Sequence, residues 1–149
     1  MRVPTIRTAA AVVAVAIWTT AAWSAAGAAQ PPARTVWAGV YAPEQARRGE
    51  PLYRESCGSC HGTSLEGGEM APPLTGGPFN SNWNGLTMGD LLERTRVSMP
   101  ANSPGSLSRQ QYTDILAFML RIGNFPEGKT ELPRETDVLR QILFESMKP

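Results

Sequence analysis

The sequence predicts an all-α fold with long loops, and three features of the chain support this prediction. Apolar residues recur at helical spacing in four segments, which we expect to be helices: 43–56, about 87–97, about 109–122 and 135–147. No segment shows the alternation of apolar and polar residues that is typical of strands. The stretch 62–77 carries paired glycines and prolines, which exclude regular structure over any length.

Each expected helix has its own local signals. Pro43 suits the first turn of the first helix, whereas Pro51 is expected to kink or divide it. The face that this helix buries is predicted from Ala46, Gly49 and Tyr53. In front of it, the segment 37–41 is expected to dock on the domain as a short arm.

The later helices are predicted from the same kinds of local signal. The helix near 87–97 carries the apolar residues Leu91 and Leu92. Ser108 is expected to cap the helix 109–122, and Gly123-Asn124 to end it. The predicted buried face of that helix contains Tyr112, Ile115, Leu116 and Met119. The last helix, 135–147, is predicted from Val138, Leu139, Ile142 and Leu143.

The motif Cys57-Gly58-Ser59-Cys60-His61 contains every cysteine and histidine of the chain. Its C-x-x-C-H pattern is the attachment signature of c-type haem. Cysteines three apart on one helical turn point the same way, so both thiols can add to the two vinyl groups at one edge of the porphyrin. The imidazole of His61 then lies under the ring, where it can bind iron.

Other readings of the motif fit less well. A thioredoxin-like dithiol needs a βαβ context, which this sequence lacks. A zinc site needs about four ligands, and the chain has three adjacent Cys and His residues in total. A simple disulfide would leave His61 without a role.

The first 29 residues resemble a secretory signal peptide. Arg2 and Arg7 form a basic start, the segment 9–23 is almost continuously apolar, and small residues up to Ala29 provide cleavage sites. The rival interpretation is a retained membrane anchor, because the run approaches the length that spans a bilayer. Export agrees with the haem motif, because covalent haem of this type is assembled outside the bacterial cytoplasm. We therefore expect a periplasmic protein.

Removal of the signal leaves about 120 residues, the size of one domain. The mature chain then has a net charge of about −1, so its composition gives no case for nucleic-acid binding.

From Gly49 to about Phe125 the order of parts resembles a class I cytochrome c. The resemblance implies the cytochrome c fold, with three core helices around one haem c that is bound covalently through Cys57 and Cys60. It also implies that the first and last core helices cross. Gly49 and Tyr53 would then face Ile115 and Phe118.

This reading divides the chain into four parts: a signal peptide at 1–29, an N-terminal arm at 30–42, a cytochrome c domain at 43–126, and an extension at 127–149 with an extra C-terminal helix. More loosely, the chain is similar to small periplasmic monohaem cytochromes that accept electrons from dehydrogenases.

His61 is the expected proximal ligand. Its other ring nitrogen needs an acceptor, and the resemblance assigns this role to the carbonyl of Pro73 in the Pro73-Leu74 turn. The alternative is that Pro72-Pro73 is simply a stiff turn. Trp83 would donate to a haem propionate, as in many relatives, or would only cover the haem edge. Asn82 is a second candidate donor.

Methionine is the usual second ligand in such proteins, and it raises the reduction potential. Met70, Met119 and Met147 are less suitable because of their short path, core position and terminal position, respectively. Of Met88 and Met99, Met99 is preferred because it lies in a loop before Pro100, which holds it extended, and relatives place their ligand in that loop. Met88 or an open iron position remain alternatives. The expected apolar pocket contains Leu65, Leu74, Phe79, Leu86 and Leu92.

These features favour a diffusible electron carrier between a dehydrogenase or membrane complex and an oxidase. Docking is expected at the exposed haem edge, through Gly58, Ser59, Ala71 and Pro72. The alternatives are a haem subunit of a periplasmic dehydrogenase complex, docked through its terminal segments; a gas-binding or enzymatic haem; and a membrane-anchored carrier.

Overall fold

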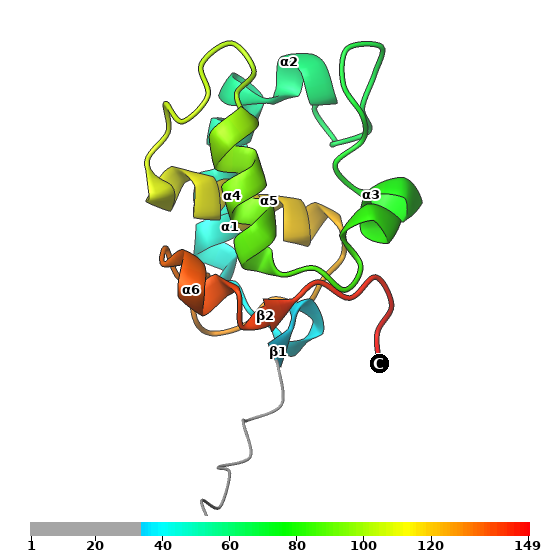
Figure 1. The fold of residues 1–149 in the computed structure, drawn as a ribbon, viewed down its shortest axis with the longest axis vertical. Coiled ribbons are helices and arrows are strands. Elements are labelled where there is room, and N and C mark those ends of the chain that lie inside the picture. Colours follow the sequence, from blue (N-terminus) through cyan, green and yellow to red (C-terminus); the bar gives the residue numbers. More distant parts are fainter. Residues whose placement is uncertain (1–33) are drawn as a thin grey trace, which may run out of the picture.

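Two helices, α1 (Pro43–Ser56) and α5 (Arg109–Ile122), cross and pack against each other (Figure 1). The computed structural model describes residues 34–149, so the expected signal peptide and the start of the N-terminal arm lie outside the described residues. Both helices have the bounds that the sequence predicts. The backbone at Asn124, which has φ 61°, turns the chain out of α5.

The crossing depends on a glycine. A Cβ atom on Gly49 would overlap the carbonyl oxygen of Asp114 and lie 3.0 Å from the backbone nitrogen of Ile115. One turn further on, the rings of Tyr53 and Phe118 lie 5.3 Å apart. The expected contact of Gly49 and Tyr53 with α5 is therefore confirmed, and it places the end of α1, where the haem motif begins, against α5.

Pro51 neither divides nor ends α1, which runs without a break to Ser56. The proline lies on the exposed side of the helix. The carbonyl of Arg47, which loses its hydrogen bond to the missing N–H, is therefore also on the solvent side. Hydration of this group makes a proline tolerable in the helix interior.

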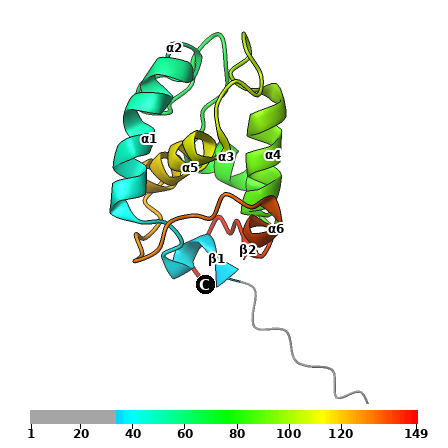
Figure 2. The same cartoon turned by 90° about the vertical axis from the view of Figure 1, so that its left-hand side faces the viewer.

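The remaining helices form the walls around this crossing. They are α2 (Gly58–His61), α3 (Gly76–Trp83), α4 (Met88–Ser98) and α6 (Thr136–Leu139). Figure 2 shows α1 and α2 along one side, α4 along the other and α5 between them. A capping box between Thr87 and Asp90 starts α4, within one residue of the sequence prediction.

Helix α3 corrects the sequence prediction, in which this segment belongs to the loop that follows the haem motif. Gly76 and Gly77 at its start have low helix propensity and suggested a turn. Phe79 and Trp83, four residues apart on one face, supply the stabilising contact, with their rings 6.2 Å apart. Phe79 is buried in the core and anchors the helix.

The N-terminal arm docks on the domain, as expected. After the short strand β1 (Arg34–Thr35), a 3₁₀ turn at Val36–Ala38 leads to the fully buried residues Val40 and Tyr41. The Tyr41 hydroxyl donates to the carbonyl of Phe125 at 2.9 Å, which ties the arm to the end of α5.

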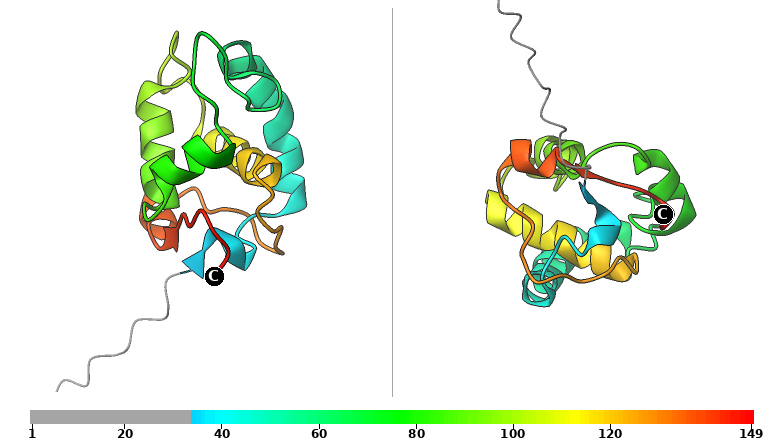
Figure 3. Two further views of the ribbon diagram at one scale, coloured as in Figure 1. Left: turned by 90° about the vertical axis from the view of Figure 1, so that its right-hand side faces the viewer. Right: turned by 90° about the horizontal axis from the view of Figure 1, so that it is seen from below.

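The predicted C-terminal helix 135–147 is wrong beyond its first turn. The chain leaves α6 after Leu139 and forms strand β2 (Ile142–Leu143), which pairs in parallel with β1 (Figure 3). The spacing of apolar residues fits a helix, but the extended backbone can pair with β1 while Ile142 and Phe144 still reach the core. Tertiary pairing therefore overrides the local pattern.

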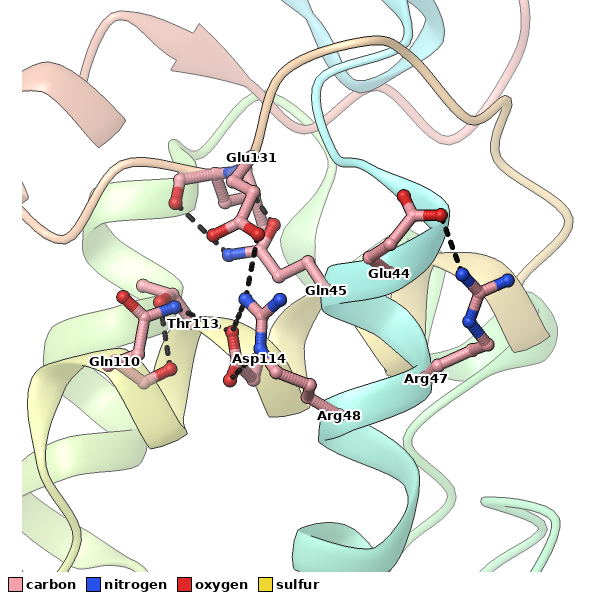
Figure 4. Close-up of polar contacts among 9 residues, drawn as sticks. Glu44, Gln45, Arg47, Arg48, Gln110, Thr113, Asp114 and Glu131 are labelled. Atoms are coloured by element: carbon pink, nitrogen blue, oxygen red, sulfur yellow. Dashed lines mark hydrogen bonds and ion pairs between the residues drawn. The ribbon is translucent and has the colours of Figure 1, made fainter.

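The segment that joins α5 to α6 is held by polar contacts (Figure 4). Arg48 on α1 donates two hydrogen bonds, of 3.1 and 3.0 Å, to the buried carboxylate of Asp114 and also pairs with Glu131 at 2.9 Å. Gln45 exchanges two hydrogen bonds with the backbone of Leu132. The C-terminal extension is thereby fastened across the α1–α5 crossing.

Within residues 34–149, no helix has the length and apolar character needed to cross a membrane.

Candidate haem site

The C-x-x-C-H motif forms a single helical turn that continues from the end of α1. The amide of Cys57 donates to the carbonyl of Tyr53 at 2.8 Å, and the carbonyl of Cys57 accepts from Cys60 and His61 at 3.1 and 3.0 Å. This turn is α2, and it places both thiols one turn apart, as the attachment chemistry requires.

The two thiols differ in environment. Cys60 is exposed, Cys57 is half-buried, and both are free. Burial raises the pKa of the Cys57 thiol to about 11, so the thiol is neutral at ordinary pH. A neutral, half-buried thiol is poorly suited to the redox exchange of a dithiol enzyme, which depends on a thiolate. This observation counts against the thioredoxin-like alternative.

His61 is buried and oriented by a backbone carbonyl. Its Nδ1 lies 2.8 Å from the carbonyl oxygen of Pro72, and 6% of the residue is exposed. Because a carbonyl can only accept, Nδ1 donates to it, and Nε2 is the ring nitrogen left to bind a metal. The expected acceptor was the carbonyl of Pro73, so the prediction was wrong by one residue along the turn.

The loop after His61 wraps back to make this contact. The amide of Gly67 donates to the carbonyl of His61 at 2.8 Å, and the amide of Leu74 donates to Leu65 at 2.9 Å. Gly67 has φ +77°, and a Cβ atom there would lie 2.5 Å from the nitrogen of Pro73. A glycine is therefore required for the close approach that carries the carbonyl of Pro72 to His61.

A tyrosine supports the other side of the same turn. The hydroxyl of Tyr53 donates to the carbonyl of Gly62 at 2.7 Å, and its ring is fully buried against α5. Burial raises the pKa of Tyr53 well above its ordinary value, which keeps the hydroxyl protonated as a donor. The histidine turn is thus tied to the helix crossing.

Met99 ends α4 in an extended conformation, with φ −129° and ψ 152°. This conformation is the one expected before Pro100. The hydroxyl of Tyr112 on α5 donates to the Met99 carbonyl at 2.8 Å, which fixes the backbone that carries the half-buried thioether. The sequence analysis identified Tyr112 as a core residue and missed this contact.

The other methionines are placed less favourably. Met88 is fully buried at the opposite end of α4, where the neighbouring Gly89 packs against α6. Figure 2 shows that α2 lies at the same end of the molecule as the last turn of α4, far from α6. Met119 is buried on α5, whereas Met70 and Met147 are 81% and 79% exposed.

Most of the residues predicted to line an apolar pocket are buried. Leu65 and Leu92 are fully buried, Phe79 is nearly so, and Leu74 packs against the core. Leu86 is 44% exposed and lies outside the pocket, because the turn that carries it runs at the surface. Gly58 is buried and therefore cannot be part of the predicted docking patch, whereas Ser59 and Pro72 are exposed.

A small cavity lies behind the loop that holds His61. Its lining includes Leu74, Thr75, Met119, Asn80 and Phe144, and its volume of about 10 Å³ is the room of a single water molecule. The Oδ1 atom of Asn80 is, among the described residues, the one buried side-chain oxygen or nitrogen without a hydrogen-bond partner. No sequence signal distinguished Asn80 from neighbouring polar residues.

Trp83 is half-buried beside Phe79, and Asn82 is exposed. Their expected hydrogen bonds to propionates stay predictions.

These residues fit a covalently bound haem. Two thiols stand one turn apart, the His61 imidazole is oriented through Nδ1 so that Nε2 is available to a metal, and buried apolar side chains lie nearby. In residues 34–149 there is no group of three or more His, Cys, Asp or Glu side chains that could hold a bare metal ion. An α1–α5 crossing with this turn and loop defines a c-type cytochrome domain.

Comparison with known proteins agrees with this class. Residues 44–119, about half of the chain, match the family described as "Cytochrome C oxidase, cbb3-type, subunit III". The chain therefore belongs to this family of c-type cytochrome domains. No curated protein matches the chain.

The crystal structure of the sulfane dehydrogenase SoxCD from Paracoccus pantotrophus is similar in fold. The TM-score is 0.50 and the identity 23%, over 72% of this chain and 61% of that chain. The chain therefore spans less than two thirds of that protein's length.

Proposed function

We propose that this protein is an exported monohaem cytochrome c that carries single electrons between redox proteins. Cys57 and Cys60 would hold haem c covalently, and His61 and Met99 would bind its iron. The observation that carries the proposal is the geometry of His61, whose Nδ1 is held by the Pro72 carbonyl so that Nε2 is free to bind iron. When bound, the haem supplies reversible one-electron chemistry at iron.

The chain's own residues tune that chemistry. Leu65 and Leu92 keep water from the pocket, which disfavours the more highly charged oxidised state and raises the reduction potential. A thioether ligand from Met99 acts in the same direction. Binding of the iron by both His61 and Met99 would leave it no position for a substrate, which favours electron transfer over catalysis. Exposed Cys60 marks the edge at which electrons enter and leave.

The ligand assignment is tested with Met99→Ala in the haem-loaded, oxidised protein. The far-red charge-transfer band of iron–thioether ligation should be present in the wild type and lost in this variant. Rapid carbon monoxide binding by the reduced variant should appear at the same time, because an iron position has opened.

Met88→Leu is the matched control, since it removes a thioether at nearly constant volume. It should keep the band. If the band survives in Met99→Ala, or disappears in Met88→Leu, Met99 is not the ligand.

A second function is a haem subunit of a periplasmic dehydrogenase complex. It is favoured by the fold similarity to the sulfane dehydrogenase SoxCD. Co-purification with a dehydrogenase at physiological ionic strength would support the subunit. Recovery of the cytochrome alone, with fast electron exchange on mixing with a dehydrogenase or oxidase, would support the diffusible carrier.

A further inference from the structure

We infer that the segment 142–146, here called the C-terminal strap, is a positioning element of the haem pocket that helps to set the reduction potential. The inference rests on the proposed function in that it requires a bound haem. It assigns a role inside the domain to a segment that lies beyond the matched family region, which ends at residue 119.

The strap reaches the pocket through Phe144. This side chain is 1% exposed and lines the small cavity together with Leu74 and Asn80. Its ring lies 5.2 Å from that of Phe125 and 5.8 Å from that of Phe79, both in edge-on geometry. Phe144 therefore closes one side of this cavity, opposite Leu74, which follows the Pro72-Pro73 turn that orients His61.

The strap also holds the turn between α3 and α4. The amide of Phe144 donates to the carbonyl of Leu86 at 2.8 Å, and the amide of Gly85 donates back to Phe144 at 2.9 Å. The backbone and hydroxyl of Ser146 both donate to Oδ1 of Asn84 at 2.9 Å. These bonds fix the residues that directly follow Trp83, the last residue of α3.

Helix α3 is the element that this anchoring positions. It carries Asn80, which lines the cavity together with Phe144 and whose buried Oδ1 lacks a protein partner. A buried amide with no partner is uncommon and calls for a ligand or a water in the complete site. By holding α3 in place, the strap fixes the positions of the Asn80 amide and the Phe79 ring in the wall of this cavity.

The strap is also anchored by residues of the N-terminal arm, which lie outside the site. Strand β2 pairs with β1, in the register Arg34 with Ile142 and Thr35 with Leu143. The indole N–H of Trp37 donates to the carbonyl of Glu145 at 2.9 Å. The N-terminal arm thus holds the strap in place, and the two terminal segments act together on the pocket.

The physical consequence concerns water. Loss of the Phe144 ring would open the cavity to solvent, and water near the iron stabilises the oxidised state. The potential should therefore fall while haem attachment at Cys57 and Cys60 and ligation by Met99 persist, since those residues lie on other elements.

The experiment compares midpoint potentials of the full-length, haem-loaded protein and its variants by spectroelectrochemical titration. Phe144→Ala should raise the ratio of oxidised to reduced protein about tenfold at a fixed potential, a shift of about 59 mV for one electron. Phe144→Leu, which keeps most of the apolar volume, should restore a potential close to that of the wild type.

Val138→Ala is the matched control, because Val138 belongs to the same extension but is 44% exposed. It should leave the potential unchanged. Asn84→Ala, at an exposed position, loosens the strap without removing Phe144 and should lower the potential by a smaller amount. This variant decides the question if Phe144→Ala does not fold.

The inference is overturned if folded Phe144→Ala has the potential of the Val138→Ala control. It is equally overturned if Phe144→Ala does not fold and Asn84→Ala leaves the potential unchanged. Failure of the proposed function has a different signature, namely a wild-type protein that carries no haem by mass or lacks the far-red band. Every potential is therefore measured on samples whose haem content and band have been recorded.

Discussion

Gly49 is the residue on which the α1–α5 crossing depends most directly. A side chain at this position would meet the backbone of Asp114 and Ile115, which cannot move without displacing α5. The same crossing orients Tyr53, which holds the turn after His61. A substitution at Gly49 is therefore expected to disturb the haem motif, because it displaces α5 and with it the packing of Tyr53.

We predict that Gly49→Ala destabilises the haem-loaded protein by about 2 kcal/mol through overpacking. Urea unfolding followed by circular dichroism measures this. Gly77→Ala is the matched control: Gly77 lies in α3 with open space around its Cβ direction, and alanine there should be neutral or stabilising by about 0.5 kcal/mol. Equal stability of Gly49→Ala and the wild type would contradict this account of the crossing.

At the scale of elements, Glu93 joins three helices. Its carboxylate accepts from Arg96 on α4 at 2.8 Å, from Thr136 on α6 at 2.7 Å and from Arg109 on α5 at 3.3 Å. The hydrogen bonds from Arg96 and Thr136 lower the pKa of Glu93 to about 2. This carboxylate is the polar link between α6, at the start of the extension, and the domain.

The stabilising effect of Glu93 should depend on pH. Because the folded pKa lies below the unfolded value of 4.5, the contribution is complete above about pH 5 and is lost as the pH falls towards 2. Glu93→Gln should be less stable than the wild type by about 1 kcal/mol at pH 7. Unfolding at a series of pH values should show this difference shrinking below pH 4.

Asp137→Asn provides the comparison for that series. Asp137 lies on α6 and pairs with Arg140, but its side chain is 91% exposed, so its removal should change stability little at any pH. A difference between wild type and Glu93→Gln that is constant from pH 7 to pH 2 would show that the carboxylate charge is not the cause.

At the scale of the whole molecule, the two terminal segments close over one end of the domain and pair with each other. Figure 3, seen from below, shows β1 beside the C-terminal segment. A short helical domain buries limited apolar surface, and these segments add Val36, Ile142 and Phe144 to its core. Residues 34–42 and 142–146 are therefore part of the fold of the domain.

Export to the periplasm is a prediction about the whole molecule. Expressed in a bacterium that matures c-type cytochromes, the protein should be recovered from the periplasm, beginning near residue 30 and heavier than its chain by one haem. Intact-mass spectrometry measures both features. Replacement of Cys57 and Cys60 together by serine should abolish the added mass. Recovery of the full-length chain in the membrane fraction would establish the anchored form instead.

The sequence by itself determined the parts of the protein that follow from local chemistry. Helices α1 and α5 have strong periodicity and clear end signals, and the C-x-x-C-H spacing identifies Cys57, Cys60 and His61 wherever the turn lies in the fold. These features involve residues within one or two turns of each other, so a linear pattern can show them.

The tertiary structure decided what depends on distant parts of the chain. The acceptor for His61 is Pro72 instead of Pro73, because the loop closes through Gly67 and Leu74. The C-terminal segment is extended beyond α6 because β1, more than a hundred residues earlier, offers backbone partners. Two conformations with similar local propensity were available to that segment, and contacts far away in the sequence selected one of them.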